Sequence, residues 1–272
     1  MTIRIAALYS YPVKGCAAVP HAELAFGPLG PRGDRTWMVI DGAGRFVTQR
    51  TVGGLARLVA TLDAAGHLHL SHPEAGSVTI AADAGTVERP VQVWSFHGPA
   101  IDAGDDAARF VEHALGAGRG YRLVRLHPDH GRTANAAWVP PGTPVSFADG
   151  YPVLVVSTAS LDALNARLRA PLEMIRFRPN IVIEGAEAFD EDRWWGLEAD
   201  GAVFQRGKLC VRCRVTTLDP RTGEPTGTEP LETLAAWRHD PELGGVTFGC
   251  NYTSAIGRLR VGQELRSIEA PT

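Results

Sequence analysis

The chain has 272 residues, of which 44% are hydrophobic and 21% charged, and its formal net charge is -3. This length suits one large domain or two small ones, and the small net charge gives no overall attraction to nucleic acid or to an anionic membrane. Four cysteines are too few for a disulfide scaffold, the N-terminus lacks the apolar core of a signal peptide, and no run of about 18 apolar residues occurs. We therefore expect a cytoplasmic protein without a membrane span.

The N-terminal part of the chain predicts short strands separated by turns. Period-two alternation or β-branched content marks residues 3–13, 21–26, 36–40, 45–49, 58–62, 68–71, 77–81 and 91–94. Turn sequences such as Asp41-Gly42-Ala43-Gly44 contain residues that tolerate positive φ, which suits hairpins with short loops. Dense hairpins favour an antiparallel sheet that closes into a barrel or a sandwich.

A helix is predicted after Asp105 or Asp106, with apolar residues at helical spacing from Ala107 to Leu115 and Gly116 as its stop. The Gly-containing loop 117–120 follows and predicts a domain boundary, because such loops carry few contacts. We therefore expect an N-terminal barrel-like domain at residues 1–117 and a second domain at residues 118–268.

The second domain is predicted to mix strands with a few helices. The expected strands are residues 151–156, 177–184, 246–252 and 258–265. Leu161, Leu164 and Leu168 stripe a helix that ends at Pro171, and residues 229–237 form a short helix with Thr228 as a candidate N-cap. The expected fold class is mainly β with some α.

Basic residues stand where several predicted strands begin or end. Lys14 follows the first strand in Y-P-V-K-G-C, from where an ammonium reaches a phosphate alongside backbone N–H groups, although a solvated surface lysine fits as well. Arg35 lies beside Asp34 and suits either a local ion pair or bidentate contact with an anion. Pro179 constrains the turn that holds Arg178 and Asn180, and this turn suits a polar, anionic ligand or simply the start of a strand.

The segment K-L-C-V-R-C-R-V-T-T-L-D-P carries Cys210 and Cys213. The β-branched residues after Cys213 favour a strand, which argues against a thioredoxin-type pair at a helix N-terminus. A zinc ribbon needs a second close pair, and Cys16 and Cys250 are isolated. Two readings remain open: small buried thiols, or one thiolate that serves a soft metal.

Taken together, these stretches resemble the MOSC family, named for the C-terminal domain of molybdenum cofactor sulfurase, in the subgroup with an N-terminal β-barrel domain. The resemblance spans nearly the whole chain and preserves the order of the motifs. They read Y-P-V-K-G-C, G-D-R-T-W, F-V-T-Q-R, F-R-P-N-I-V-I-E-G, C-V-R-C-R-V-T-T-L-D-P-R-T-G and F-G-C-N-Y. The fold that this resemblance implies is an antiparallel N-terminal barrel followed by a MOSC β-barrel with flanking helices.

The resemblance also implies a pyranopterin molybdenum cofactor, with Cys213 as the protein's metal ligand and catalytic residue, whereas Cys210 is not expected to be a ligand. Positions that hold the pterin and its phosphate in the family are occupied by Lys14, Gly15, Arg35, Arg178, Asn180 and Asn251. Gly15 replaces a serine common in the family, and Gly150-Tyr151 replace small hydroxylated residues. Backbone N–H groups can substitute for the hydroxyl donors that these replacements remove.

The function that the resemblance implies is reduction of N-hydroxylated compounds. Electrons would come from a separate protein of the flavin reductase, ferredoxin or cytochrome type, since the spacing of the four cysteines does not suit an iron–sulfur cluster. An alternative is a module that carries the cofactor, or transfers sulfur to it, without turning over a substrate. A structural thiol protein without a metal is the third possibility.

Overall fold

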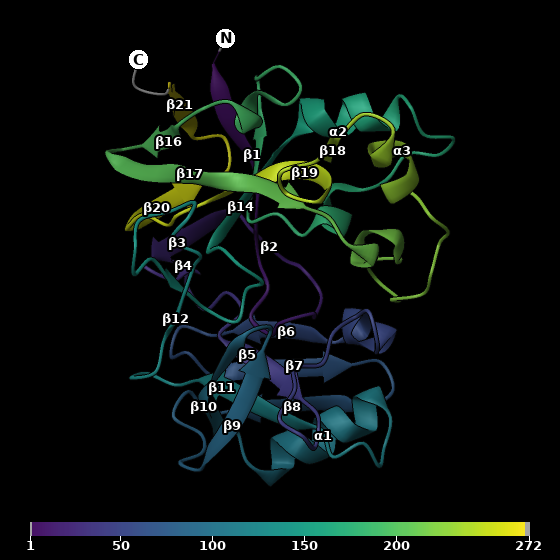
Figure 1. Ribbon diagram of the computed structural model, residues 1–272. Helices are drawn as coiled ribbons and strands as arrows, with labels where there is room; N and C mark the ends of the chain where they lie inside the picture. The colour runs from purple at the N-terminus through teal and green to yellow at the C-terminus, as the bar shows by residue number, and fades with distance from the viewer. Residues whose placement is uncertain (1, 270–272) are drawn as a thin grey trace.

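The computed structural model describes residues 2–269 and consists mainly of strands. Figure 1 shows two bodies, a barrel that carries β1, β14–β17, β19 and β21, and below it a half-barrel that carries β5–β11 and α1. The prediction of a mainly β fold with some α is confirmed.

The barrel is one sheet that closes on itself. Its strands run in the order β14, β15, β1, β21, β16, β17, β19, and β19 pairs back with β14. Their bounds are β1 (Ile3–Ser10), β14 (Val153–Ser157), β15 (Ile181–Glu184), β16 (Gly196–Ala199), β17 (Ala202–Val211), β19 (Gly245–Tyr252) and β21 (Glu264–Ile268). Only the β14–β15 pair within this ring is parallel. The interior is filled by buried side chains such as Ile5, Phe204 and Tyr252.

Smaller elements extend and cover the barrel. Among the strands, β2 (Val19–His21) pairs with β1, β18 (His239–Asp240) pairs with β19, and β3 (Glu23–Gly27), β4 (Gly30–Pro31) and β20 (Gly257–Arg260) form a sheet of their own. The helices are α2 (Thr158–Asn165) and α3 (Leu231–Ala235), with 3-10 turns η2 (Met174–Phe177), η3 (Asp190–Asp192) and η4 (Arg214–Thr217). An outer core that includes Leu164, Phe177 and Phe248 joins α2, η2 and β19.

The half-barrel consists of two sheets around a second core. One sheet has the order β5 (Trp37–Ile40), β11 (Arg122–Leu126), β10 (Phe96–Asp102), β9 (Glu88–Val93), and the other has β6 (Val59–Leu62), β7 (Leu68–His72), β8 (Gly76–Ile80). Helix α1 (Asp105–Leu115) and the 3-10 turn η1 (Gly53–Arg57) pack against this core, which contains Leu55, Phe110 and Val111. A short pair, β12 (Arg132–Thr133) with β13 (Pro144–Val145), lies on the connection back to the barrel.

Several predicted elements differ from the structure. The segment 45–49 makes only isolated bridges, from Phe46 to Ile40 and from Arg45 to Gln92, so its predicted strand is wrong. The β-branched stretch after Cys213 is also not a strand, because residues 214–217 form η4. The hydroxyls of Thr216 and Thr217 donate to the carbonyls three residues earlier, and these local bonds favour a turn over a strand.

The strands of the two bodies are not separated along the sequence at residue 117. Strand β1 lies in the barrel although it begins the chain, and β11 completes a half-barrel sheet although it follows residue 117. The predicted domain bounds, residues 1–117 and 118–268, therefore stay a prediction about the sequence, because each of the two bodies contains strands from both ranges. Within residues 2–269, no helix combines the length and the apolar character that a membrane crossing requires.

Candidate functional site

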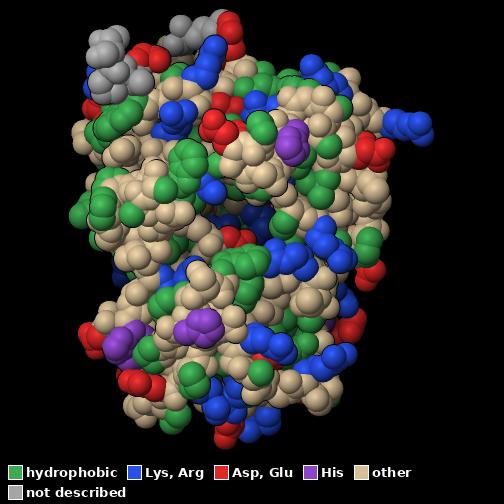
Figure 2. Space-filling view, viewed as in Figure 1, with side chains coloured by type: hydrophobic (Ala, Val, Ile, Leu, Met, Phe, Trp, Pro, Cys, Tyr) green, Lys and Arg blue, Asp and Glu red, His purple; other side chains and the backbone are tan. Residues whose placement is uncertain are grey.

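A cavity of about 670 Å³ opens between the two bodies, with Lys14, Arg50 and Trp94 on its half-barrel side and Lys208 and Asn251 on its barrel side. Figure 2 shows it as a hollow in the middle of the molecule, with basic and acidic side chains inside. The cationic side chains in its lining are Lys14, Arg35, Arg50, Arg132, Arg178, Lys208 and Arg212. Among the described residues that line it, Asp149 is the only acidic one. This excess of positive charge favours an anionic ligand.

Lys14 is a buried cation of the cavity, as is Arg132. Its backbone N–H bonds to the carbonyl of Trp37 across the bridge between Val13 and Trp37, which fixes the start of the side chain. Its Nζ donates to the Phe147 carbonyl at 2.7 Å and to Asp149 Oδ1 at 2.5 Å. Burial lowers the pKa of Lys14, and the Asp149 charge acts in the opposite direction. For Asp149, which is exposed to the cavity, partial desolvation by the cavity walls acts to raise the pKa, but the charge and hydrogen bond of Lys14 outweigh it and hold the pKa well below its usual range.

Arg35 and Arg178 converge on one aromatic ring. Their guanidinium carbons lie 4.3 and 4.2 Å from the Tyr11 ring centroid, and Arg35 also pairs with buried Asp34 at 2.5 Å. Both arginines have positive φ, 50° and 57°, a conformation that costs about 1 kcal/mol or more for a residue other than glycine and that clusters at functional sites. Burial acts to lower the pKa of both; the Asp34 charge raises the pKa of Arg35 overall, whereas Arg35 lowers that of Arg178 further.

Asn180 lines the cavity, but its side-chain amide makes hydrogen bonds to other groups of the protein. Its Nδ2 donates to the Tyr9 carbonyl and to Asp34 Oδ1, and its Oδ1 accepts from Leu154 N–H at 3.2 Å and from Arg35 at 3.4 Å. These bonds hold Arg35 in place. A direct contact between Asn180 and a cofactor stays a prediction, as do the cofactor contacts of Lys14, Arg35 and Arg178.

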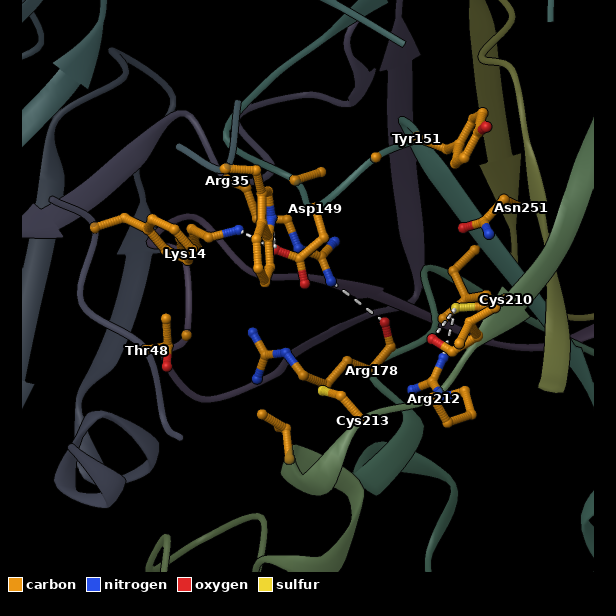
Figure 3. A pocket seen from close by; sticks show the side chains of 18 of the residues that line it. Lys14, Arg35, Thr48, Asp149, Tyr151, Arg178, Cys210, Arg212, Cys213 and Asn251 are labelled. Atoms are coloured by element: carbon orange, nitrogen blue, oxygen red, sulfur yellow. Dashed lines mark hydrogen bonds and ion pairs between the residues drawn. The ribbon is translucent and has the colours of Figure 1, made fainter. Parts of the chain in front are cut away.

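Cys213 presents an exposed thiol to the cavity at the start of η4. Arg50 Nη1 lies 3.6 Å from its Sγ, and the Arg50 guanidinium carbon lies 4.7 Å from the Trp94 ring centroid. Figure 3 shows the Cys213 sulfur directed toward the interior of the pocket, near Arg178. The thiolate is the form of a cysteine that binds a metal, and this sulfur is open to a ligand in the cavity.

Cys210 has a different environment, although it lines the same cavity. Arg212 Nη1 donates to Cys210 Sγ at 2.8 Å, and Arg212 Nη2 donates to the Phe177 carbonyl at 2.6 Å (Figure 3). The remaining cysteines lie outside the lining, since Cys16 belongs to the half-barrel core and Cys250 to the barrel core. Burial raises the pKa of both thiols, to about 12 for Cys16.

The remaining predicted residues also reach the cavity. Gly15 lines it with φ +84°, and its carbonyl accepts from Gln49 Nε2 at 2.6 Å. The Asn251 side-chain amide makes no hydrogen bond to any described residue, so it is available to a ligand. The buried Tyr151 hydroxyl likewise has no partner within the described part of the chain, and burial raises its pKa to about 12, which keeps it protonated.

Sequence reasoning did not single out Arg50, Trp94, Arg132 and Arg212, and it did not predict a role for Asp149. Arg50 was within reach, because it ends the quoted motif F-V-T-Q-R. Trp94 and Asp149 offered no local signal, since their meeting depends on how the two bodies pack. Trp94 Nε1 donates to Asp149 Oδ1 at 3.1 Å.

The donor set of the cavity suits an anion that carries a phosphate and a soft metal. Its guanidinium and ammonium groups match phosphate oxygens, the free Asn251 amide matches a heterocycle edge, and a thiolate at Cys213 matches a soft cation. Within residues 2–269, no group of three or more His, Cys, Asp or Glu side chains is arranged to hold a metal ion.

Comparisons with known proteins agree with this architecture. The MOSC N-terminal beta barrel domain matches residues 2–118, and the MOSC domain matches residues 142–266. Mitochondrial amidoxime-reducing component 1 of Homo sapiens is 34% identical over 249 residues, which cover 87% of this chain and 73% of that protein. Mitochondrial amidoxime reducing component 2 of Homo sapiens is 32% identical over 274 residues, covering 95% and 81%. Mitochondrial amidoxime-reducing component 1 of Xenopus laevis is 32% identical over 276 residues, covering 95% and 80%.

Proposed function

Because the chain belongs to the MOSC family, and its similar relatives are named amidoxime-reducing components, we propose that it is a molybdenum-dependent oxidoreductase that reduces N-hydroxylated compounds. The observation that carries the proposal is the exposed Cys213 thiol in a cavity lined by cations. A soft metal ligand and an anion-binding surface occur together there, as a phosphate-bearing metal cofactor requires.

Each of the cavity residues is proposed to contact one part of a pyranopterin molybdenum cofactor. Cys213 would bind the metal through its thiolate, and Lys14, Arg35 and Arg178 would hold the phosphate. Asn251 would offer its free amide to the pterin, and Gly15 would contribute through its backbone. When bound, the cofactor supplies two-electron reduction at molybdenum.

The protein's own contribution is to bind, orient and enclose. Asp34 and Asn180 fix the Arg35 guanidinium, so that it needs no reorganisation when a ligand arrives. Reduction of an N–hydroxy group consumes two electrons and two protons and releases water. The protons come from solvent at the cavity mouth, and the electrons come from a separate donor protein of the flavin reductase, ferredoxin or cytochrome type.

Protein produced in a host that makes the cofactor tests the proposal. The measurements are molybdenum by mass spectrometry, pterin by fluorescence after oxidation, and reduction of benzamidoxime by reduced methyl viologen. We expect wild-type protein and Cys210→Ser to hold molybdenum and turn over, and Cys213→Ser to lose both properties. Equal metal content and turnover in wild type and Cys213→Ser would contradict the assignment.

The same measurements separate the alternatives. Molybdenum and pterin without turnover of any N-hydroxylated compound would favour a carrier or sulfur-transfer module. Absence of both would favour a structural thiol protein. The relatives are named mitochondrial, and a cytoplasmic location for this chain stays a prediction that fractionation of the source cells would test.

A further inference from the structure

We propose that Arg50 is a catalytic residue that binds the oxygen of the substrate's N–O group beside Cys213. This inference rests on the proposed function, because it names the group that recognises the reacting atom of an N-hydroxylated substrate. Three observations carry it: the free hydrogen-bonding capacity of Arg50, its place next to the thiol, and the way in which it is held.

Arg50 differs from the other arginines of the cavity in what it contacts. Carboxylate or carbonyl oxygens accept hydrogen bonds from Arg35, Arg132, Arg178 and Arg212. Within residues 2–269, no oxygen accepts a hydrogen bond from the Arg50 guanidinium, whose single polar contact is Cys213 Sγ at 3.6 Å. A guanidinium carries five N–H donors in a fixed fork. Most donors of Arg50 are therefore available to an oxygen-bearing ligand.

Both ends of Arg50 are fixed. Its backbone N–H donates to Thr48 Oγ1 at 3.0 Å, within a turn in which the Thr48 carbonyl accepts from Val52 N–H at 2.8 Å. Its guanidinium carbon lies over the Trp94 ring at 4.7 Å. The side chain is thus directed at the cavity and at Cys213. Within residues 2–269 it makes no ion pair, although its charge lies close enough to help lower the pKa of Asp149.

Trp94 is held in a conformation that the structure must support. It has φ 54° in the turn between β9 and β10, where glycine, asparagine or aspartate is the usual residue. Its large aromatic side chain is also 45% exposed. Its Nε1 donates to Asp149 Oδ1 at 3.1 Å, and its ring lies 5.1 Å from the Phe46 ring. A strained residue at a cavity is a recurrent feature of functional sites. Trp94 and Asp149 are therefore positioning residues for Arg50.

The chemistry gives Arg50 a task. As the N–O bond breaks, its electron pair leaves with oxygen, and negative charge grows on that atom before protons from solvent convert it to water. Two electrons from the separate donor protein complete the reduction of nitrogen. Donors already aimed at the developing charge lower the barrier, because they need not reorient during the reaction.

Methionine and lysine substitutions of Arg50 test the proposal, with Arg214→Met as the matched control. Arg214 adjoins Cys213 in sequence, is exposed, and is not part of the cavity lining. We expect Arg50→Met to lower kcat/KM for benzamidoxime about 10²-fold, as removal of one oxyanion donor does, and Arg50→Lys to recover part of the loss. Molybdenum and pterin content should match wild type in all three. Wild-type kcat/KM in Arg50→Met would overturn the proposal.

A binding measurement decides the question without turnover. Benzoate carries anionic oxygens but no N–O bond, so calorimetry can follow its binding to the oxidised, cofactor-loaded protein. We expect Arg50→Met to weaken benzoate binding at least tenfold and Arg214→Met to leave it unchanged. Should Arg50→Met fail to hold cofactor, the comparison of Arg50→Lys with wild type decides, and equal benzoate affinity in those two proteins together with equal kcat/KM counts against the proposal.

Variants of Trp94 test the positioning role. Trp94→Phe keeps an aromatic face for Arg50 and should retain most activity, whereas Trp94→Leu should raise KM and weaken benzoate binding as Arg50→Met does. Equal behaviour of Trp94→Leu and wild type would remove Trp94 from the proposal. If wild type binds benzoate through Arg50 but reduces no N-hydroxylated compound, the proposed function fails while the oxygen-binding role of Arg50 stands.

Discussion

The Lys14 ammonium and the Asp149 carboxylate meet at 2.5 Å across the cavity wall, with the lysine side chain 9% exposed and the aspartate side chain 64% exposed. The pair is asymmetric, because the cation is fixed in the protein while the anion reaches it from a loop open to the cavity. A buried ammonium without a counter-charge is unfavourable, so Asp149 stabilises the ligand-free protein.

We expect Asp149→Asn to lower the free energy of unfolding of cofactor-free protein by about 1 kcal/mol at pH 7, a modest value because the carboxylate is exposed. The folded-state pKa of Asp149 lies below its ordinary value, so this contribution is complete above about pH 4 and fades as pH falls further. Urea denaturation at pH 7 and pH 3 measures both effects. The control is Asp83→Asn, since Asp83 is exposed and makes no ion pair among the described residues. A difference from wild type that grows at pH 3 would contradict this account.

Arg178 yields a prediction about cofactor retention. Its guanidinium lies in the cavity beside Tyr11, whereas Arg119 is exposed and lies outside the lining. We expect Arg178→Met to retain the cofactor at least tenfold less well than Arg119→Met, because a charge-assisted hydrogen bond contributes about 1.5–3 kcal/mol. Molybdenum and pterin content after gel filtration is the measurement, and circular dichroism checks that both variants fold. Comparable retention in the two variants would argue against a phosphate site at Arg178.

The family resemblance implied that Lys14, Arg35 and Arg178 share one site, and the structure brings all three to the same cavity. The residues alone left a surface lysine, a local ion pair and a strand-start turn open as alternatives. Helix α1 could be predicted from local signals, namely its apolar spacing and Gly116, each of which depends on a few neighbouring residues. The structure places its N-cap at Gly104, which offers no side-chain cap.

The features that escaped prediction depend on contacts between distant residues. The barrel closes through β14 and β19, whose pairing joins Val153 to Tyr252 and leaves no local trace. Trp94, Asp149 and Arg50 meet only because the half-barrel faces the barrel. The strand predicted after Cys213 was wrong for the opposite reason. Local hydrogen bonds from the Thr216 and Thr217 hydroxyls to backbone carbonyls outweigh the β propensity of this segment.

A contact between two glycines joins the loop after Cys213 to the half-barrel. A Cβ at Gly223, where φ is +75°, would lie 1.9 Å from the Gly53 carbonyl oxygen. Gly142 has a similar φ of +81° but open space around the same position. We expect Gly142→Ala to cost about 1 kcal/mol from backbone strain alone, and Gly223→Ala to cost clearly more and to retain less molybdenum. Denaturant unfolding compares them, and equal losses would show that the contact has no importance.

The positions of the four cysteines lead to a prediction about electrons. Cys16 and Cys250 are fully buried in different cores, and their pKa values are raised, so they remain protonated thiols. Cys210 and Cys213 line the cavity, and the proposed function assigns Cys213 to molybdenum. A cluster held by four thiolates needs them around one point, and these four are divided among the two cores and the cavity.

We therefore expect purified protein to contain no stoichiometric iron and to leave NADH and NADPH unoxidised when it is alone with benzamidoxime. Addition of a reductase or a small electron carrier from the source cells should start turnover, because electrons then reach the cavity from outside. Iron analysis with visible absorption tests the first statement, and nicotinamide oxidation with and without the second protein tests the other. Iron at one or more atoms per chain, or reduction driven by nicotinamide without a second protein, would show that this chain carries its own electron-transfer centre.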